Sequence, residues 1–143
     1  MNDDTVRLLL ECSSGIHMAV SSIDDVQGSA ADAQLRRTLE MSKQHHKRLG
    51  GRTKMLLDRL GSPVKDADSL ARSMSWMKTN WKLMMKPSDA TVADLITDGC
   101  AMGIKSLSRY CNQYPAASAE ARSIARELID SEEQLTHEIR RFL

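Results

Sequence analysis

Aromatic side chains are scarce in this 143-residue chain, which has two Trp, two Tyr and one Phe. β-Sheets draw heavily on aromatic and β-branched residues. No stretch of the sequence clusters such residues with the two-residue alternation of a strand. Nine Met residues, together with Leu and Ile, supply the apolar bulk instead, and such flexible side chains commonly fill the cores of helical bundles. The composition therefore predicts an all-α protein.

Long apolar runs and paired cysteines are also missing. No run approaches the roughly 20 apolar residues that a membrane span requires, so we expect no transmembrane segment. The three cysteines, Cys12, Cys100 and Cys111, form no Cys-x-x-Cys pair, and the last two would lie roughly 16 Å apart on one helix, too far for a disulfide. Asp3 and Asp4 stand where a signal peptide has a basic region. We therefore expect reduced thiols and a cytoplasmic location.

The remaining composition is that of a folded domain. Hydrophobic residues make up 41% of the chain and charged residues 27%, which is too apolar for a disordered segment. A chain of this length can bury a substantial core. We expect a single helical-bundle domain over residues 1–143.

Turn and capping residues divide the sequence into five predicted helices. These helices cover about 3–26, 30–60, 66–85, 88–114 and 118–143. Gly28 ends the first helix, and Ser29 with Asp32 forms a loose capping box before the second. The sequence Gly61-Ser62-Pro63 ends the second helix, and Ser88 and Ser118 open the last two.

Loop lengths predict how these helices are connected. The first two helices are joined by a short loop, as are the last two, and short loops make antiparallel neighbours. The connection between the two hairpins is mostly helical, and its helix spans roughly 28 Å. That length returns the chain along the bundle, so that helices 30–60 and 88–114 run parallel. The sequence predicts two antiparallel hairpins joined by a long helical crossover.

The chain resembles the ferritin-like superfamily, in particular its small bacterial branches. The resemblance rests on the helix lengths, the crossover, the stop at Leu60-Gly61-Ser62-Pro63 and the pair Glu132-Glu133 before His137. It implies a ferritin-like four-helix bundle. Members with intact sites bind two iron or manganese ions through a Glu from each of two helices and Glu-x-x-His from the other two.

Counting residues from the turns gives candidate ligands for such a site. His17, Glu40, Cys100 and Glu133 are expected at one level of the bundle, with Glu11 level with His46. However, Lys43 follows Glu40 at the position of the required His, and Thr136 follows Glu133. We therefore expect no intact di-metal site and no bound cofactor, and a non-catalytic structural or interaction protein. The alternative is an iron- or manganese-binding protein with ligands His17, His46, Glu11 and Glu40.

His46 also falls on a heptad stripe of the second helix. The stripe consists of Leu35, Leu39, Ser42, His46, Leu49, Thr53, Leu56 and Leu60. A core histidine is usually neutral and hydrogen-bonded, and Ser13, Ser14 and Ser42 are the expected partners of His17 and His46. A second alternative comes from the segment 45–51, in which His46 is followed by cations and by Gly50. This segment faintly resembles the motif of histidine phosphotransfer domains, which act in signalling.

Charge is unevenly distributed despite a net charge of +1. Residues 43–86 contain eleven basic and three acidic residues. This segment is a candidate surface for an anionic partner or for the acidic parts of a second copy. We expect a homodimer in which Trp76 of the crossover contributes to the contact. Nucleic acid is not an expected partner, because no aromatics alternate with the cations.

Overall fold

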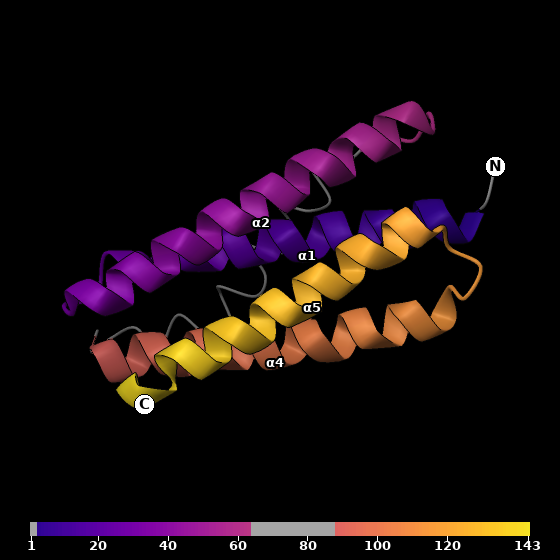
Figure 1. The fold of residues 1–143 in the computed structure, drawn as a ribbon. Coiled ribbons are helices and arrows are strands. Elements are labelled where there is room, and N and C mark those ends of the chain that lie inside the picture. The colour runs from indigo at the N-terminus through magenta and orange to yellow at the C-terminus, as the bar shows by residue number, and fades with distance from the viewer. Residues whose placement is uncertain (1–2, 64–87) are drawn as a thin grey trace.

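The computed structural model describes residues 3–63 and 88–143. Regular structure in these residues is entirely helical, with four long helices packed together and no strand (Figure 1). The prediction of an all-α protein is confirmed for this part of the chain. The predicted crossover helix over 66–85, including Trp76, lies outside the described residues.

The first hairpin is formed by α1 (Asp3–Gln27) and α2 (Ala33–Arg59). The N-cap of α2 is Asp32, whose side chain accepts a hydrogen bond from Leu35 N at 3.0 Å. The prediction that this helix begins directly after Ser29 was therefore wrong by three residues. The reason is that Ser29 N is bonded back to Val26 O in the turn that ends α1, which leaves the capping role to Asp32.

The second hairpin is formed by α4 (Asp89–Gln113) and α5 (Ala119–Ile139), followed by a 3-10 turn over Arg140–Phe142. Both predicted N-caps are confirmed. Ser88 accepts from Thr91 N at 3.1 Å, and Ser118 accepts from Ala121 N at 3.2 Å. Each hydroxyl satisfies one of the backbone N–H groups that have no partner within the first turn of a helix.

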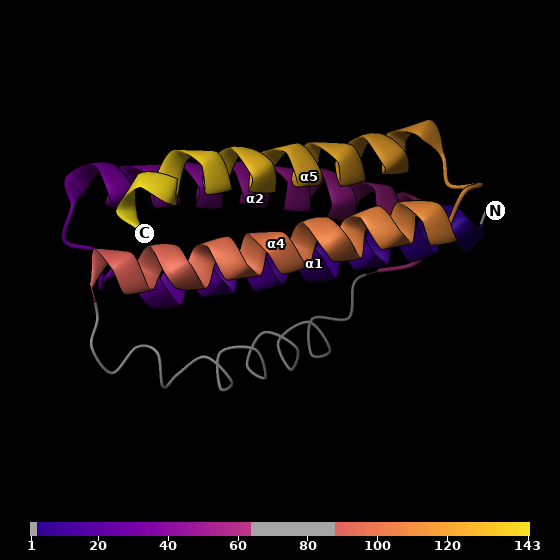
Figure 2. The same cartoon turned by 90° about the horizontal axis from the view of Figure 1, so that it is seen from below.

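The two hairpins lie side by side along their whole length (Figure 2). Within each hairpin the helices run antiparallel, and α2 runs in the same direction as α4, as Figure 1 shows. Helix α1 packs against α2, α4 and α5, and α5 also packs against α2 and α4. The predicted parallel course of the second and fourth helices is thus confirmed.

Hydrogen bonds between the hairpins fix both ends of the bundle. At one end Asp89 Oδ1 accepts from Ala31 N at 2.7 Å. At the other end Asp4 Oδ2 accepts from Ala116 N at 3.0 Å, and Thr5 Oγ1 accepts from Ser118 N at 2.8 Å. These contacts join the loop of each hairpin to the first turn of a helix in the other, which sets the lengthwise register of the four helices.

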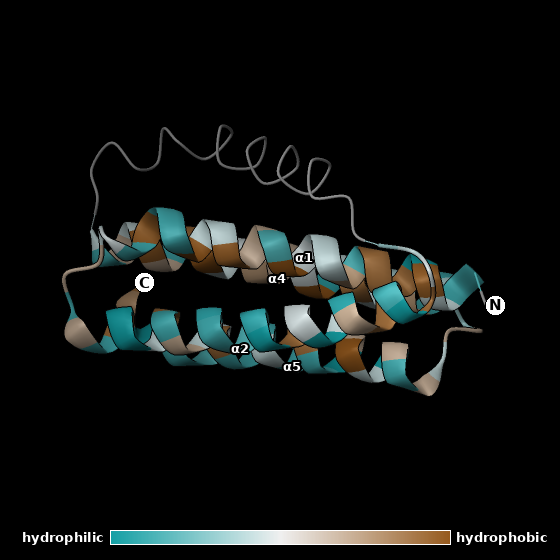
Figure 3. Ribbon diagram, turned by 90° about the horizontal axis from the view of Figure 1, so that it is seen from above, coloured by the Kyte–Doolittle hydropathy of each residue, from teal (hydrophilic) through white to brown (hydrophobic). Residues whose placement is uncertain are grey.

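The core consists of two apolar clusters, one toward each end of the bundle. The cluster at the α4–α5 loop includes Leu8, Leu9, Ile16, Leu49, Leu57, Ile124 and Leu128. The cluster at the α1–α2 loop includes Ile23, Val26, Leu35, Leu39, Leu95, Leu135 and Ile139. Figure 3 shows mostly hydrophilic residues along the outward side of α2. Two polar residues, His46 of α2 and Glu132 of α5, are buried at the level where the clusters meet.

The predicted stripe of α2 is largely the buried face of the helix. Leu35, Leu39, His46, Leu49 and Thr53 are buried. Near the C-terminal end Leu57 is fully buried, whereas Leu56 and Leu60 are only partly covered. A straight helix has 3.6 residues per turn, so its buried face drifts away from a strict seven-residue repeat. None of the helices in the described ranges has the length and apolarity needed to cross a membrane.

Candidate functional site

His46 is held in the middle of the bundle by the backbone of its own helix. Only 1% of its surface is exposed. Nδ1 lies 2.8 Å from the carbonyl oxygen of Ser42, one turn earlier, and 3.4 Å from the Ser42 hydroxyl. A carbonyl oxygen can only accept, so Nδ1 carries a proton and donates it to this bond. The ring is thereby fixed with Nε2 pointing across the bundle.

Glu132 of α5 meets this nitrogen. Its Oε1 lies 3.1 Å from His46 Nε2, in a contact that joins α2 to α5 within the core. A single proton occupies this contact, either on the imidazole or on the carboxyl group. In both cases the two groups together are electrically neutral, which is the usual way for a protein to bury a carboxylate.

The surroundings favour the imidazolium–carboxylate form. Burial alone would lower the pKa of His46, but the hydrogen bond and the charge of Glu132, together with the Ser42 carbonyl, raise that pKa above its usual value. The expected Ser42 partner of His46 is present at Nδ1, and a carboxylate rather than a hydroxyl faces its second nitrogen. Glu132 also acts on Cys100. Burial, and then the negative charge of Glu132, raise the pKa of that thiol far above its usual value.

The Glu132 carboxylate packs against α4 at Gly103. A Cβ atom placed on Gly103 would lie 3.5 Å from Cδ of Glu132 and 3.7 Å from each of its oxygens, which are ordinary van der Waals distances. Ala would therefore fit at this position, whereas a side chain that extends beyond Cβ toward Glu132 would meet the carboxylate. A second close approach occurs at Gly50 of α2, where a Cβ would lie 3.3 Å from Cγ2 of Ile16. The helix continues through Gly50 and Gly51, and Gly50 marks a close crossing of α2 with α1.

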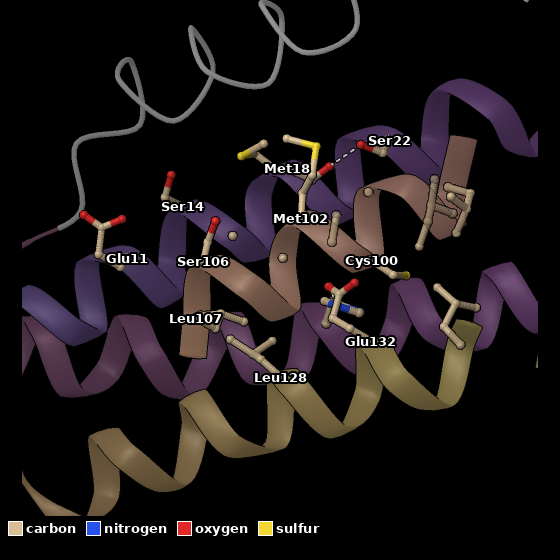
Figure 4. Close-up of a pocket in the computed structure, with 18 of the residues that line it drawn as sticks. Glu11, Ser14, Met18, Ser22, Cys100, Met102, Ser106, Leu107, Leu128 and Glu132 are labelled. Atoms are coloured by element: carbon tan, nitrogen blue, oxygen red, sulfur yellow. Dashed lines mark hydrogen bonds and ion pairs between the residues drawn. The ribbon is translucent and has the colours of Figure 1, made fainter. Parts of the chain in front are cut away.

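The His46–Glu132 pair forms one side of a pocket of about 150 Å³ between α1 and α4. In Figure 4 the Glu132 carboxylate points from α5 into this space, and Met18 and Met102 lie on the opposite side. Leu107 and Leu128 line the pocket beside the carboxylate. The pocket is partly open to solvent, and apolar side chains make up most of its wall. It combines an apolar body with a few polar groups, among them the buried Glu132 carboxylate, which is the usual design of a small-molecule site.

The structure separates the four predicted metal ligands. His46 and Glu11 line the same pocket, but Glu11 lies on α1 well away from Glu132 (Figure 4). His17 is half-buried and lies outside the pocket lining. Glu40 lies at the surface of α2, where its Oε2 pairs with Lys43 Nζ at 3.2 Å.

The predicted level of Glu133 also needs a correction of one residue. Glu133 is exposed, and its neighbour Glu132 is the buried carboxylate that lies against Cys100. A shift of one position turns a helical side chain by about 100°, because the helix has 3.6 residues per turn. Counting from the turns therefore found the correct level of the bundle and the wrong face of α5.

These residues do not fit a two-metal centre of the iron or manganese type. Over residues 3–63 and 88–143, no group of three or more His, Cys, Asp or Glu is arranged to hold a metal ion. His46 Nε2 is hydrogen-bonded to Glu132 and Nδ1 to Ser42, so neither ring nitrogen is available to a metal. Hard cations of this kind require several oxygen ligands around one point. Beside the imidazole the pocket offers the carboxylate of Glu132, and Glu11 lies well away from it (Figure 4).

Glu132 was not among the expected site residues, although the sequence contains a signal for it. The apolar stripe of α5 consists of Ile124, Leu128, Leu135, Ile139 and Phe142. That stripe has a seven-residue gap between Leu128 and Leu135, and Glu132 stands at the position that fills it. A charged residue at an interior position of a heptad stripe indicates that a group on another helix pairs with it, either an opposite charge or a hydrogen-bonding side chain. His46 occupies the equivalent position on α2.

No protein family, curated protein or solved structure matches this chain. The ferritin-like resemblance therefore stays a prediction, and function has to be inferred from the pocket and its buried pair.

Proposed function

We propose that this chain is a non-catalytic bundle of ferritin-like topology that binds a small, largely apolar molecule in the pocket between α1 and α4. In this proposal the chain has no intact di-metal site, and the His46–Glu132 pair occupies the middle of the bundle in its place. The observation that carries it is the pocket itself, which has mostly apolar walls and a buried carboxylate, that of Glu132, held in place by His46. The two antiparallel hairpins, with α2 and α4 parallel, support the ferritin-like topology.

The state of the polar groups supports binding rather than catalysis. Burial raises the pKa of Cys12 to about 12 and that of Cys100 still further, so both thiols are protonated near neutral pH and are poor nucleophiles. Both ring nitrogens of His46 have hydrogen-bond partners. A general base needs a free lone pair within reach of a substrate proton, and this histidine offers none.

The same burial disfavours the two alternatives considered from the sequence. Phosphotransfer requires an accessible imidazole nitrogen, whereas His46 is almost completely enclosed. A metal-binding role requires the donors to converge, and within the described residues they do not.

Ligand binding can be tested by filling the pocket. Ser106 lines the pocket, and Ser108, two residues further along α4, is exposed. We expect benzyl alcohol to shift the backbone amide NMR signals of pocket residues in the native protein and in the variant Ser108→Leu. In Ser106→Leu the added side chain occupies the cavity, and these shifts should disappear. Equal shifts in both variants, or none in the native protein, would contradict the proposal.

We also propose a homodimer, in which α2 takes part. Its outward side exposes Met41 and Met55, with 66% and 63% of their surfaces accessible. Met55 lies among the basic residues that begin the positive segment 43–86, and Met41 lies two residues before it. The same segment remains a candidate surface for an anionic partner. Light scattering at low and high salt tests the dimer, with Met55→Ser expected to weaken it. A monomer at every protein concentration and salt concentration would refute it.

A further inference from the structure

The pocket between α1 and α4 presents a buried carboxylate to a ligand. Glu132 points into the pocket (Figure 4), and its Oε1 is bonded to His46 Nε2 at 3.1 Å. The pair is neutral as a unit, but its carboxylate end faces the cavity, while only 1% of the surface of His46 is exposed. A positively charged ligand would meet complementary charge at this end of the pair.

Glu132 retains capacity for a further hydrogen-bond donor. An ionised carboxylate has about four lone-pair sites. His46 Nε2 occupies one of them at 3.1 Å, and the Cys100 thiol is a second, weaker donor to the group. The carboxylate points into the pocket, and only 7% of the surface of Glu132 is exposed. A donor delivered by a ligand would therefore bind it in a setting with little competition from water.

The size of the cavity limits the ligand. Its volume is about 150 Å³, close to that of an engineered apolar cavity of about 150 Å³ that accommodates benzene. The side opposite the carboxylate is formed by Met18 and Met102, whose thioethers adapt to apolar groups and contact aromatic edges favourably. The space suits an apolar body of about six carbon atoms.

We propose that the pocket binds a small primary amine in its ammonium form, with the ammonium group on the Glu132 carboxylate and an apolar body against Met18 and Met102. This proposal rests on the proposed ligand-binding function and specifies the chemical class of the ligand. His46 acts as a positioning residue, because it holds the carboxylate toward the cavity through Oε1 and stays outside the ligand contact.

The test uses three probes of the same size and different charge. These are benzylamine, benzyl alcohol and benzoate, which are cationic, neutral and anionic at neutral pH. Binding to the native protein is measured by amide NMR titration at pH 7. A charge-assisted hydrogen bond exceeds a neutral one, so we expect benzylamine to bind about tenfold more tightly than benzyl alcohol or better, with benzoate the weakest.

The contribution of the carboxylate is tested with a matched pair of variants. Glu132→Gln keeps the shape of the side chain and removes its charge, and the neighbouring Glu133→Gln changes an exposed residue. We expect the preference for benzylamine over benzyl alcohol to vanish in Glu132→Gln and to remain in Glu133→Gln. Circular dichroism monitors folding. If Glu132→Gln does not fold, the three-probe series on the native protein still decides the question of charge.

The outcomes separate this proposal from the proposed function. If benzyl alcohol binds as tightly as benzylamine or more tightly, the ammonium proposal is refuted while ligand binding stands. If benzylamine is preferred equally in Glu132→Gln, the cation is bound elsewhere and the assignment to Glu132 is refuted. If none of the probes shifts the pocket signals at millimolar concentration, both the proposed function and the ammonium proposal fail.

Discussion

The buried His46–Glu132 pair makes a sharp prediction about the stability of the bundle. Replacing either residue alone by Leu leaves the other polar group buried without its partner. Removing one member of a buried ion pair commonly costs about 3–5 kcal/mol. Glu132 retains 7% exposure toward the pocket, so we expect His46→Leu to cost about 3 kcal/mol, at the low end of that range. Glu132→Leu leaves an unsatisfied imidazole nitrogen, for which about 1–3 kcal/mol is expected.

The double variant His46→Leu/Glu132→Leu should recover most of this loss. Both positions lie on apolar stripes, between Leu39 and Leu49 on α2 and between Leu128 and Leu135 on α5. Well-packed apolar replacements of a buried ion pair are often neutral or stabilising. We therefore expect the double variant to lie within about 1 kcal/mol of the native protein, which corresponds to a coupling of about 3 kcal/mol or more.

Urea unfolding of the four proteins at pH 7, followed by circular dichroism, measures this coupling. Glu133→Leu is the control, because it changes an exposed neighbour and should shift stability by about 0.5 kcal/mol or less. Single-variant losses that add within about 0.5 kcal/mol in the double variant would show that the two groups do not stabilise each other. That result would refute the view of the pair as a proton-sharing unit.

Three further predictions concern pH, helix packing and thiol reactivity. Because the pKa of His46 is raised in the folded state, its stabilising contribution is present below its unfolded-state pKa of about 6.5 and is lost as pH rises through its folded-state pKa. Unfolding titrations between pH 6 and 9 should show this loss of stability in the native protein and not in His46→Leu. Gly51→Ala should raise the free energy of unfolding by about 0.5–1 kcal/mol, because its Cβ meets nothing within 4 Å. Gly50→Ala should raise it by less, because its Cβ would lie 3.3 Å from a side chain of α1. A larger increase for Gly50→Ala in urea unfolding would contradict the close crossing. A thiol reagent should modify half-buried Cys111 well before buried Cys100, whose pKa is raised. Mass spectrometry of partly labelled protein gives the order of modification. Preferential labelling of Cys100 would show that the pocket opens widely.

The sequence predicted the helices and their connections because these depend on local chemistry. Ser88 and Ser118 cap helices through their own hydroxyl groups, and Gly61 adopts the positive φ of 73° that follows the end of α2. The start of the second helix, at Asp32, was misplaced by three residues and involved two polar residues within three positions of each other. Either one could supply the cap, and only the turn geometry selected between them.

The candidate site was only partly predictable. His46 was identified because a polar residue on a heptad stripe must be buried. Its partner was not identified, because a stripe shows that a residue faces inward and not which residue of another helix it meets. Counting from turns placed Glu133 at one level with His17 and Glu40, but it did not determine which way these side chains face. An error of one residue rotates a helical side chain by about 100°.

The sequence by itself determined the all-α class, the helix boundaries within a few residues and the inward position of His46, because capping, helical periodicity and loop length are local properties of the chain. Only the tertiary structure decided that Glu132 meets His46, that this carboxylate packs against Gly103, and that a cavity remains between α1 and α4. These features depend on the register and rotation of four helices packed together. Ångström-scale differences in packing decide whether two polar groups 86 residues apart in sequence form a hydrogen bond.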